Sequence, residues 1–237
     1  MVRSLVKPLA VALRDAVDAA MPQRCLLCGG TCGGAPVCDA CGDELPRLPS
    51  TSCPQCALPS PGGHCGRCLR HPPAFDASRA LLAYAFPADR LVQALKYRGR
   101  LGLASYFSRL VVGAWPPPAV DCVVAVPMHA RALRERGFNQ AMELARPLAR
   151  AWDLPLFPDA LRRVGDGPPQ ASLAGRARRR NVRGAFVCDE RLADRAVLVV
   201  DDVMTTGATL DAIARCVRRA GAKRVENLVV ARTLAPD

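Results

Sequence analysis

The sequence predicts an α/β protein: a mostly parallel sheet flanked by helices, preceded by an N-terminal helix and a small cysteine-rich segment. Three observations support this fold class. From residue 79 onward, apolar runs of strand length alternate with helical patterns, which is typical of a parallel sheet. Four CxxC pairs lie between Cys25 and Cys68. Half of the 237 residues are hydrophobic, yet no apolar run approaches the roughly 20 residues of a transmembrane helix, so we expect no membrane insertion.

Residues 1–24 are predicted to form an amphipathic helix, because leucines and valines recur at helical spacing between residues 5 and 17. We expect this apolar stripe to pack on the protein; a membrane-surface or transit role is the alternative. Asp15 and Asp18 interrupt the apolar core that a secretory signal would need. We therefore expect a cytoplasmic protein whose cysteines bind metal rather than form disulfides.

The next predicted domain, residues 25–72, contains the four CxxC pairs at near-equal spacing. Two CxxC turns can supply four thiolates in a tetrahedral shell, so we predict two structural Zn²⁺ sites in a double zinc ribbon. Pairing of consecutive turns is the simplest arrangement, and an interleaved one is the alternative. The predicted ligands are Cys25, Cys28, Cys38, Cys41, Cys53, Cys56, Cys65 and Cys68.

Three further potential ligands lie in this segment. Cys32 is interpreted as a spare thiol, with exchange into the first site as the alternative, and His64 and His71 are interpreted as bystanders. A segment of this length with few large apolar side chains cannot bury enough surface to fold alone. Bound metal is therefore expected to stabilise it.

The larger predicted domain, residues 76–237, begins after a proline-containing linker at residues 71–74. Apolar runs predict strands at 79–85, 122–126, 197–200 and 225–231. Helical patterns lie between them, at 89–97, 103–114, 140–152 and 208–220, and Gly221 follows the last of these.

Positive charge is concentrated in this larger predicted domain, residues 76–237. The chain has a formal net charge of +12, which favours anionic partners. Seven arginines lie between residues 162 and 183; they are interpreted as a solvated helix face, as ligands for phosphates, or as contacts to the backbone of single-stranded DNA. The nucleic-acid candidates among them are Arg176, Arg178, Arg179, Arg180 and Arg183.

The most informative segment follows the predicted strand at 197–200. Two carboxylates, Asp201 and Asp202, precede a short turn and a helix N-terminus. In parallel sheets ligands bind at the carboxyl ends of strands. The turn supplies backbone N–H groups and threonine hydroxyls that suit a phosphate, and the carboxylates suit two ribose hydroxyls. Helix capping alone would explain one Asp or one Thr, but not the whole string.

This string, VLVVDDVMTTGATL, resembles the phosphoribosyl pyrophosphate (PRPP) binding motif of type I phosphoribosyltransferases. A second string, from Val126 to Gln140, resembles the signature of the ComF family of competence proteins, of the ComFC type. The resemblance implies zinc ribbons followed by a type I phosphoribosyltransferase-like domain. It also implies PRPP binding with Mg²⁺, and a role in natural competence with single-stranded DNA and DNA-uptake proteins as partners.

The resemblance also implies roles for individual residues. Asp201 and Asp202 would bind the ribose hydroxyls, and the loop beginning at Pro127 would hold pyrophosphate with Mg²⁺. Its candidate charge partners are Lys96, Arg131 and Arg136, and no catalytic residue is assigned. Two hypotheses follow: a PRPP-dependent transferase, or a non-catalytic PRPP sensor that binds single-stranded DNA. The residues that would hold the 5′-phosphate are Thr205, Thr206, Gly207, Ala208 and Thr209.

Overall fold

The chain divides into two compact units, Met1–Leu45 and Pro46–Asp237. The computed structural model describes residues 23–164 and 185–234. The predicted N-terminal helix therefore lies outside the described residues, except that its last two residues, Gln23 and Arg24, form a strand. Within the described ranges, no helix has both the length and the apolar character needed to cross a membrane.

The smaller unit contains a short antiparallel ribbon and one helix. Strand β1 (Gln23–Arg24) pairs with β2 (Thr31–Cys32), and helix α2 (Asp39–Asp43) follows. Among the described residues of this unit, these are the only regular elements. Four of the predicted metal ligands lie in and around them.

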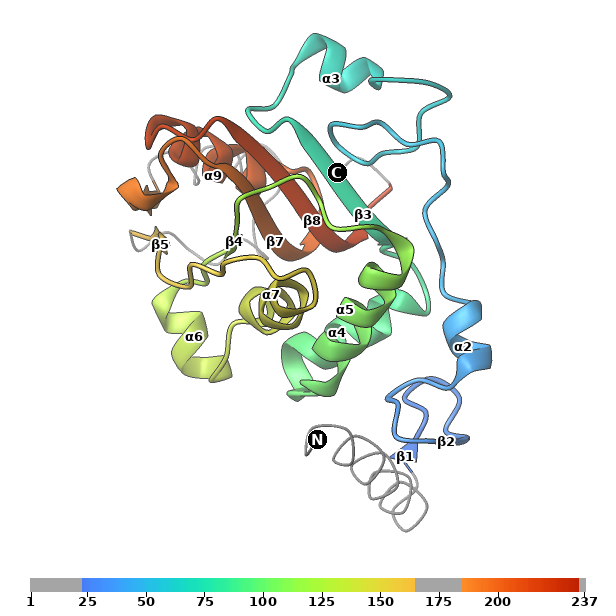
Figure 1. The fold of residues 1–237 in the computed structure, drawn as a ribbon. Coiled ribbons are helices and arrows are strands. Elements are labelled where there is room, and N and C mark those ends of the chain that lie inside the picture. Colours follow the sequence, from blue (N-terminus) through green and yellow to red (C-terminus); the bar gives the residue numbers. More distant parts are fainter. Residues whose placement is uncertain (1–22, 165–184, 235–237) are drawn as a thin grey trace, which may run out of the picture. The chain divides into compact units, whose positions relative to one another are not determined.

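The larger unit is built on a four-stranded sheet in which all neighbouring strands are parallel (Figure 1). Its strands are β3 (Ala77–Ala83), β4 (Cys122–Ala125), β7 (Ala196–Met204) and β8 (Arg224–Arg232), and their spatial order is β3-β8-β7-β4. The four predicted strands and the predicted fold class, a parallel sheet flanked by helices, are confirmed.

Strand β7 continues past its predicted end. The sequence places the end at Val200, whereas the strand includes Asp201 and Asp202 and ends at Met204. It continues because β8 remains paired beside it, with Asp201 opposite Val229 and Met204 opposite Arg232. The two carboxylates are therefore fixed by the backbone of a sheet and do not lie in a loop.

The predicted helices of the larger unit are confirmed to within one residue at each end. They are α4 (Ala88–Arg98), α5 (Gly102–Ala114), α7 (Gln140–Ala151) and α9 (Ala208–Arg219). A further helix, α6 (Ala130–Arg136), is not among the predicted helices. A turn of 3-10 helix, η3 (Glu190–Leu192), precedes β7.

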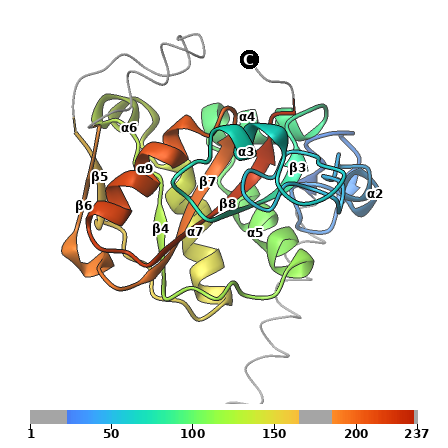
Figure 2. The same cartoon turned by 90° about the horizontal axis from the view of Figure 1, so that it is seen from above.

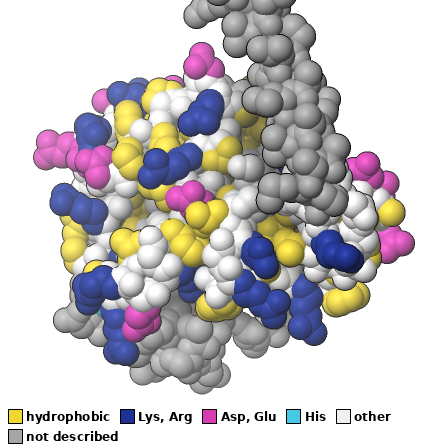
Figure 3. Space-filling view, turned by 90° about the horizontal axis from the view of Figure 1, so that it is seen from below, with side chains coloured by type: hydrophobic (Ala, Val, Ile, Leu, Met, Phe, Trp, Pro, Cys, Tyr) yellow, Lys and Arg dark blue, Asp and Glu magenta, His cyan; other side chains and the backbone are white. Residues whose placement is uncertain are grey.

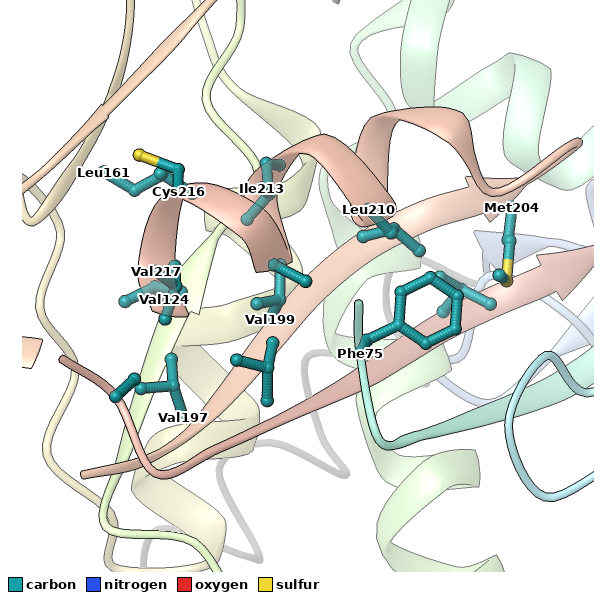
Figure 4. Close-up of a cluster of buried hydrophobic side chains, with 14 of the residues drawn as sticks. Phe75, Val124, Leu161, Val197, Val199, Met204, Leu210, Ile213, Cys216 and Val217 are labelled. Atoms are coloured by element: carbon teal, nitrogen blue, oxygen red, sulfur yellow. The ribbon is translucent and has the colours of Figure 1, made fainter. Parts of the chain in front are cut away.

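The sheet is covered on both faces (Figures 1 and 2). Side chains of a strand point alternately to opposite faces. Val197 and Val199 of β7 belong to a buried cluster with Leu210 and Ile213 of α9, which Figure 4 shows in close-up. Helices α5 and α7 contact each other and pack on the other face, where α7 also contacts β4 and β7.

The larger unit also contains an antiparallel ribbon that the sequence does not predict. It consists of β5 (Leu161–Arg163) and β6 (Phe186–Cys188). Cys188 of this ribbon forms a disulfide with Cys216 of α9. The expectation that the cysteines bind metal rather than form disulfides is therefore wrong for this pair.

The boundary between the compact units differs from the predicted limits, 25–72 and 76–237. It falls after Leu45, so the last four predicted metal ligands lie in the larger unit with the sheet. The predicted linker is held in place there: the Ala74 N–H donates to Asp211 Oδ1 over 2.7 Å, and the Arg218 guanidinium donates to the Ala74 carbonyl. Arg218 also pairs with Asp76 at 2.5 Å. Helix α3 (Gly66–Arg70) belongs to this region.

Candidate functional site

The acidic pair at the end of β7 is joined to helix α4 by an ion pair. Lys96 Nζ lies 3.1 Å from Asp202 Oδ2, and both side chains are largely shielded from solvent. Burial disfavours the Lys96 ammonium, but the charges of Asp202 and Asp201 outweigh this effect and raise the pKa of Lys96. Lys96, which the sequence suggested as a partner for pyrophosphate, is thus the counter-charge of the acidic pair.

Asp201 has an unusual electrostatic environment. Burial, together with the charge of neighbouring Asp202, raises the pKa of Asp201 to about 8. One of its oxygens accepts a hydrogen bond from the Asp202 N–H over 2.9 Å. Two carboxylates with one lysine beside them can accept hydrogen bonds from hydroxyl groups or bind a further cation.

The β7–α9 loop, Thr205 to Gly207, connects the acidic pair to a helix N-terminus. Gly207 has a φ of 82°, and a Cβ on it would lie 2.8 Å from Met204 Cε, so the loop requires glycine here. The Thr206 hydroxyl accepts a hydrogen bond from the Ala208 N–H. The first turn of α9 directs N–H groups and the positive end of the helix dipole toward the space before it.

A buried arginine holds the backbone at the start of this loop by hydrogen bonds. Arg232, at the end of β8, is only 1% exposed. Its Nη1 donates to the carbonyls of Met204 and Thr205, and its Nε donates to the Cys56 carbonyl. Burial, and also the charge of Arg67, lower the pKa of Arg232.

The remaining predicted anion ligands lie near the ends of β4 and α4. Pro127 follows β4 and is half-buried. The Arg136 guanidinium stacks 5.1 Å from the centre of the Tyr97 ring. Arg131 is exposed and pairs with Glu135 at 2.8 Å. His129 caps α6 by accepting a hydrogen bond from the Arg131 N–H.

The loop after β4 is anchored by Asn139. Its amide donates to the Val126 carbonyl over 3.0 Å and also accepts the Ala141 N–H at the start of α7. The structure thereby brings the ends of β4 and β7 and helix α4 to one edge of the sheet. This edge is where parallel sheets bind ligands.

The predicted nucleic-acid residues cannot be placed. Arg176, Arg178, Arg179, Arg180 and Arg183 lie outside the described residues. Of the same basic run, Arg162 and Arg163 lie in β5, and the Arg163 guanidinium stacks on Phe186 at 5.9 Å. On the face shown in Figure 3, basic side chains are interspersed with hydrophobic and acidic ones.

The eight predicted metal ligands form two clusters from consecutive CxxC pairs. The first cysteine cluster is Cys25, Cys28, Cys38 and Cys41, and the second is Cys53, Cys56, Cys65 and Cys68. The four sulfur atoms of each lie within 4.8 Å of one another, with Cys28 and Cys38 at 3.8 Å and Cys56 and Cys65 at 3.5 Å. Sulfurs around tetrahedral zinc are about 3.8 Å apart, so both clusters fit the ion.

The chemistry of the sulfurs agrees with this geometry. Burial opposes ionisation of Cys25 and Cys53, but backbone N–H groups outweigh it and lower the pKa of each to about 6. A hydrogen bond with Cys38, together with burial, raises the pKa of Cys41 to about 12. Four adjacent thiols cannot all ionise without a cation to hold them. Cys32, His64 and His71 are outside both clusters.

Arg232 and Asp211 are functional candidates that sequence reasoning missed. Arg232 is the last residue of a largely apolar strand, and a cation buried at such a position needs hydrogen-bond partners. Asp211 lies in the first turn of α9 and reads as an ordinary helix-dipole residue, but it accepts the Ala74 N–H across 137 positions of sequence.

Comparison with known proteins decides the family. DNA utilization protein YhgH of Escherichia coli O157:H7 is 35% identical over 228 residues, covering 90% of this chain and 99% of that protein. The chain belongs to the ComF family. Competence protein F of Haemophilus influenzae (29% identical, 86% of this chain, 94% of that protein) and Competence protein ComFC of Bacillus subtilis (26%, 78% and 79%) are also similar.

A domain family matches within this ComF-family chain as well. The phosphoribosyl transferase domain matches residues 132–236. This range includes the acidic pair, the β7–α9 loop and Arg232, and it excludes both cysteine clusters. The described geometry and the matched domain therefore point to the same edge of the sheet.

Proposed function

We propose that the chain binds PRPP, with Mg²⁺, at the carboxyl edge of its sheet and acts as a phosphoribosyltransferase-like protein. The observation that carries the proposal is the placement of Asp201 and Asp202 directly before the glycine-dependent β7–α9 loop and the N-terminus of α9. The match to the phosphoribosyl transferase domain over the same residues supports it.

The ligand would be divided among three parts of the site. The carboxylates of Asp201 and Asp202 would accept hydrogen bonds from the ribose hydroxyls. Hydroxyl and N–H groups of Thr205, Thr206, Gly207, Ala208 and Thr209 would hold the 5′-phosphate. The loop at Pro127 would face the pyrophosphate, with Arg136 as the preferred candidate cation, because Lys96 and Arg131 already have acidic partners.

Transfer would break the bond between the anomeric carbon and pyrophosphate and form a bond to an acceptor nucleophile. Bound Mg²⁺ would neutralise the departing pyrophosphate. The chain's own contribution would be to hold the ribose and the phosphate in place, and the acidic pair would stabilise positive charge on the ribose ring.

We place this activity in the cytoplasm, in the use of DNA that cells take up. The support is the names of the relatives, a DNA utilization protein and two competence proteins. Two structural Zn²⁺ ions, one in each cysteine cluster, complete the proposed protein. They would be closed sites that stabilise the fold and take no part in the reaction.

The test combines binding with turnover. Full-length protein with Mg²⁺ and PRPP is followed by phosphorus NMR for pyrophosphate release, alone and with a panel of nucleobases, and compared with Asp201→Asn/Asp202→Asn. Release that the double variant loses supports a transferase. Binding of PRPP without release under any condition supports a sensor, and absence of PRPP binding contradicts the proposed function.

A further inference from the structure

We propose that Arg67, carried by the second cysteine cluster, binds the 5′-phosphate of the ligand, so that the metal-binding region forms part of the ligand site. This inference rests on the proposed function and adds a residue outside the matched domain. Arg67 lies in α3 between the metal-ligand candidates Cys65 and Cys68. Any ion held by those two sulfurs would therefore fix the backbone that presents Arg67.

The Arg67 guanidinium reaches the β7–α9 loop. A Cβ on Gly207 would lie 3.9 Å from Arg67 Nη2 and 3.9 Å from Phe75 Cζ. The same loop is where the proposed function places the 5′-phosphate. A guanidinium this close to the position that a Gly207 Cβ would occupy can meet phosphate oxygens bound at the loop with two parallel N–H donors.

Arg67 has no anionic partner within the part of the chain that the structure describes. Two arginines of α9 are paired with acids: Arg215 with Asp211 at 3.2 Å, and Arg218 with Asp76 at 2.5 Å. Arg67 is half-buried, and it faces the positive end of α9 near the buried Arg232. Such a cluster of positive charge is unfavourable until an anion binds.

Arg232 provides a second link between the cysteine cluster and the loop. It donates to the carbonyl of Cys56 and to those of Met204 and Thr205. The backbone of a metal-ligand candidate and the backbone of the loop are thus held by one buried side chain. Because coupling between two sites is reciprocal, ligand at the loop should also hold the metal more firmly.

Calorimetry with fragments of the ligand tests the role of Arg67. Arg67→Ala should weaken binding of PRPP and of ribose 5-phosphate about ten-fold or more, the effect of losing one charged hydrogen-bonding partner. Binding of pyrophosphate should not change. Arg67→Lys should recover part of the loss. Arg70→Ala, an exposed arginine three positions along α3, is the matched control and should bind like wild type.

Two results would overturn the inference in different ways. If wild-type protein does not bind PRPP, this inference and the proposed function both fail. If wild type binds PRPP and Arg67→Ala binds it as well as Arg70→Ala does, only the inference fails.

Release of zinc to a chromogenic chelator gives a readout independent of turnover. Ribose 5-phosphate should slow the release of one of the two zinc equivalents from wild type, and it should slow this release less in Arg67→Ala. Equal protection in both proteins would contradict the proposed coupling, since it would show that the ligand acts without Arg67.

Discussion

At the scale of single residues, the carboxylate of Asp201 is in the least favourable environment of the proposed ligand site. It is half-buried beside Asp202, and Lys96 pairs with only the second of them. A protein optimised only for stability would not place two acids here. The arrangement is reasonable if hydroxyl groups of a ligand share the negative charge.

The raised pKa of Asp201 predicts how stability depends on pH. The folded pKa is about 8 against an ordinary 3.8, so the folded state binds more protons than the unfolded state between these values. Rising pH therefore destabilises the fold. Asp201→Asn should be more stable than wild type by about 1 kcal/mol or more at pH 8.5, a modest gain because solvent partly screens the Asp201 charge. The gain should vanish near pH 4.

Chemical denaturation across this pH range, without Mg²⁺, measures the difference. Asp159→Asn is the control, because its hydrogen bond to Arg191 lowers the pKa of Asp159; its substitution should therefore cost most stability above the unfolded pKa and less as pH falls through the folded pKa. A gain for Asp201→Asn that does not change with pH would contradict the assigned environment.

Gly207 gives a second prediction at this scale. Alanine there would be strained at a φ of 82° and would press against Met204, so Gly207→Ala should cost about 1–2 kcal/mol of the free energy of unfolding and weaken PRPP binding. Gly102→Ala, in the first turn of α5 with nothing near its Cβ, should instead stabilise by about 0.5–1 kcal/mol. Thermal unfolding compares the two, and equal effects would contradict the account of the loop.

At the scale of elements, the sequence predicts the helices and strands whose apolar pattern is visible within their own residues. All four residues of β4 are buried, and α9 buries one face. Helix α6 was missed because it buries none of its residues, so no apolar periodicity marks it. The end of β7 was missed because aspartates are rare in strands, and only pairing with β8 keeps them there.

The candidate site shows the same limit. Asp201, Asp202 and Gly207 belong to one contiguous motif and could be predicted. Arg67 and Arg232 could not be, because they meet the loop through contacts between segments far apart in the sequence, such as Cys56 with Arg232. Only the fold brings these segments together.

The two cysteine clusters are predicted to differ in their effect on the larger unit. Cys53, Cys56 and Cys68 share a buried cluster with Phe75 and other core residues of the larger unit, whereas the first cysteine cluster lies in the other compact unit. Cys65→Ser should therefore destabilise the larger unit by at least about 2 kcal/mol, while Cys28→Ser should leave it nearly unchanged.

Hydrogen exchange of β7 and β8, measured on both cysteine variants, separates these cases. Faster exchange of these strands in Cys65→Ser alone is the expected result. Similar exchange in both variants would show that the second cysteine cluster does not support the sheet.

At the scale of the whole molecule, the second cysteine cluster and the residues that match the phosphoribosyl transferase domain lie in one compact unit. The domain match begins at residue 132, yet the first strand of the sheet and Lys96 lie before it. The ligand edge is therefore built from residues within the matched range and from residues that precede it. Bound ligand would link these parts, and the excess of positive charge would favour an anionic ligand.

The central claim is that the acidic pair and the β7–α9 loop together bind PRPP. Isothermal titration of metal-loaded, full-length protein with PRPP and Mg²⁺ tests it most directly, with Asp201→Asn/Asp202→Asn as the comparison. We expect saturable one-to-one binding by wild type that is at least about ten-fold weaker in the double variant. Absence of heat with wild type, or equal affinity in the two proteins, would contradict it.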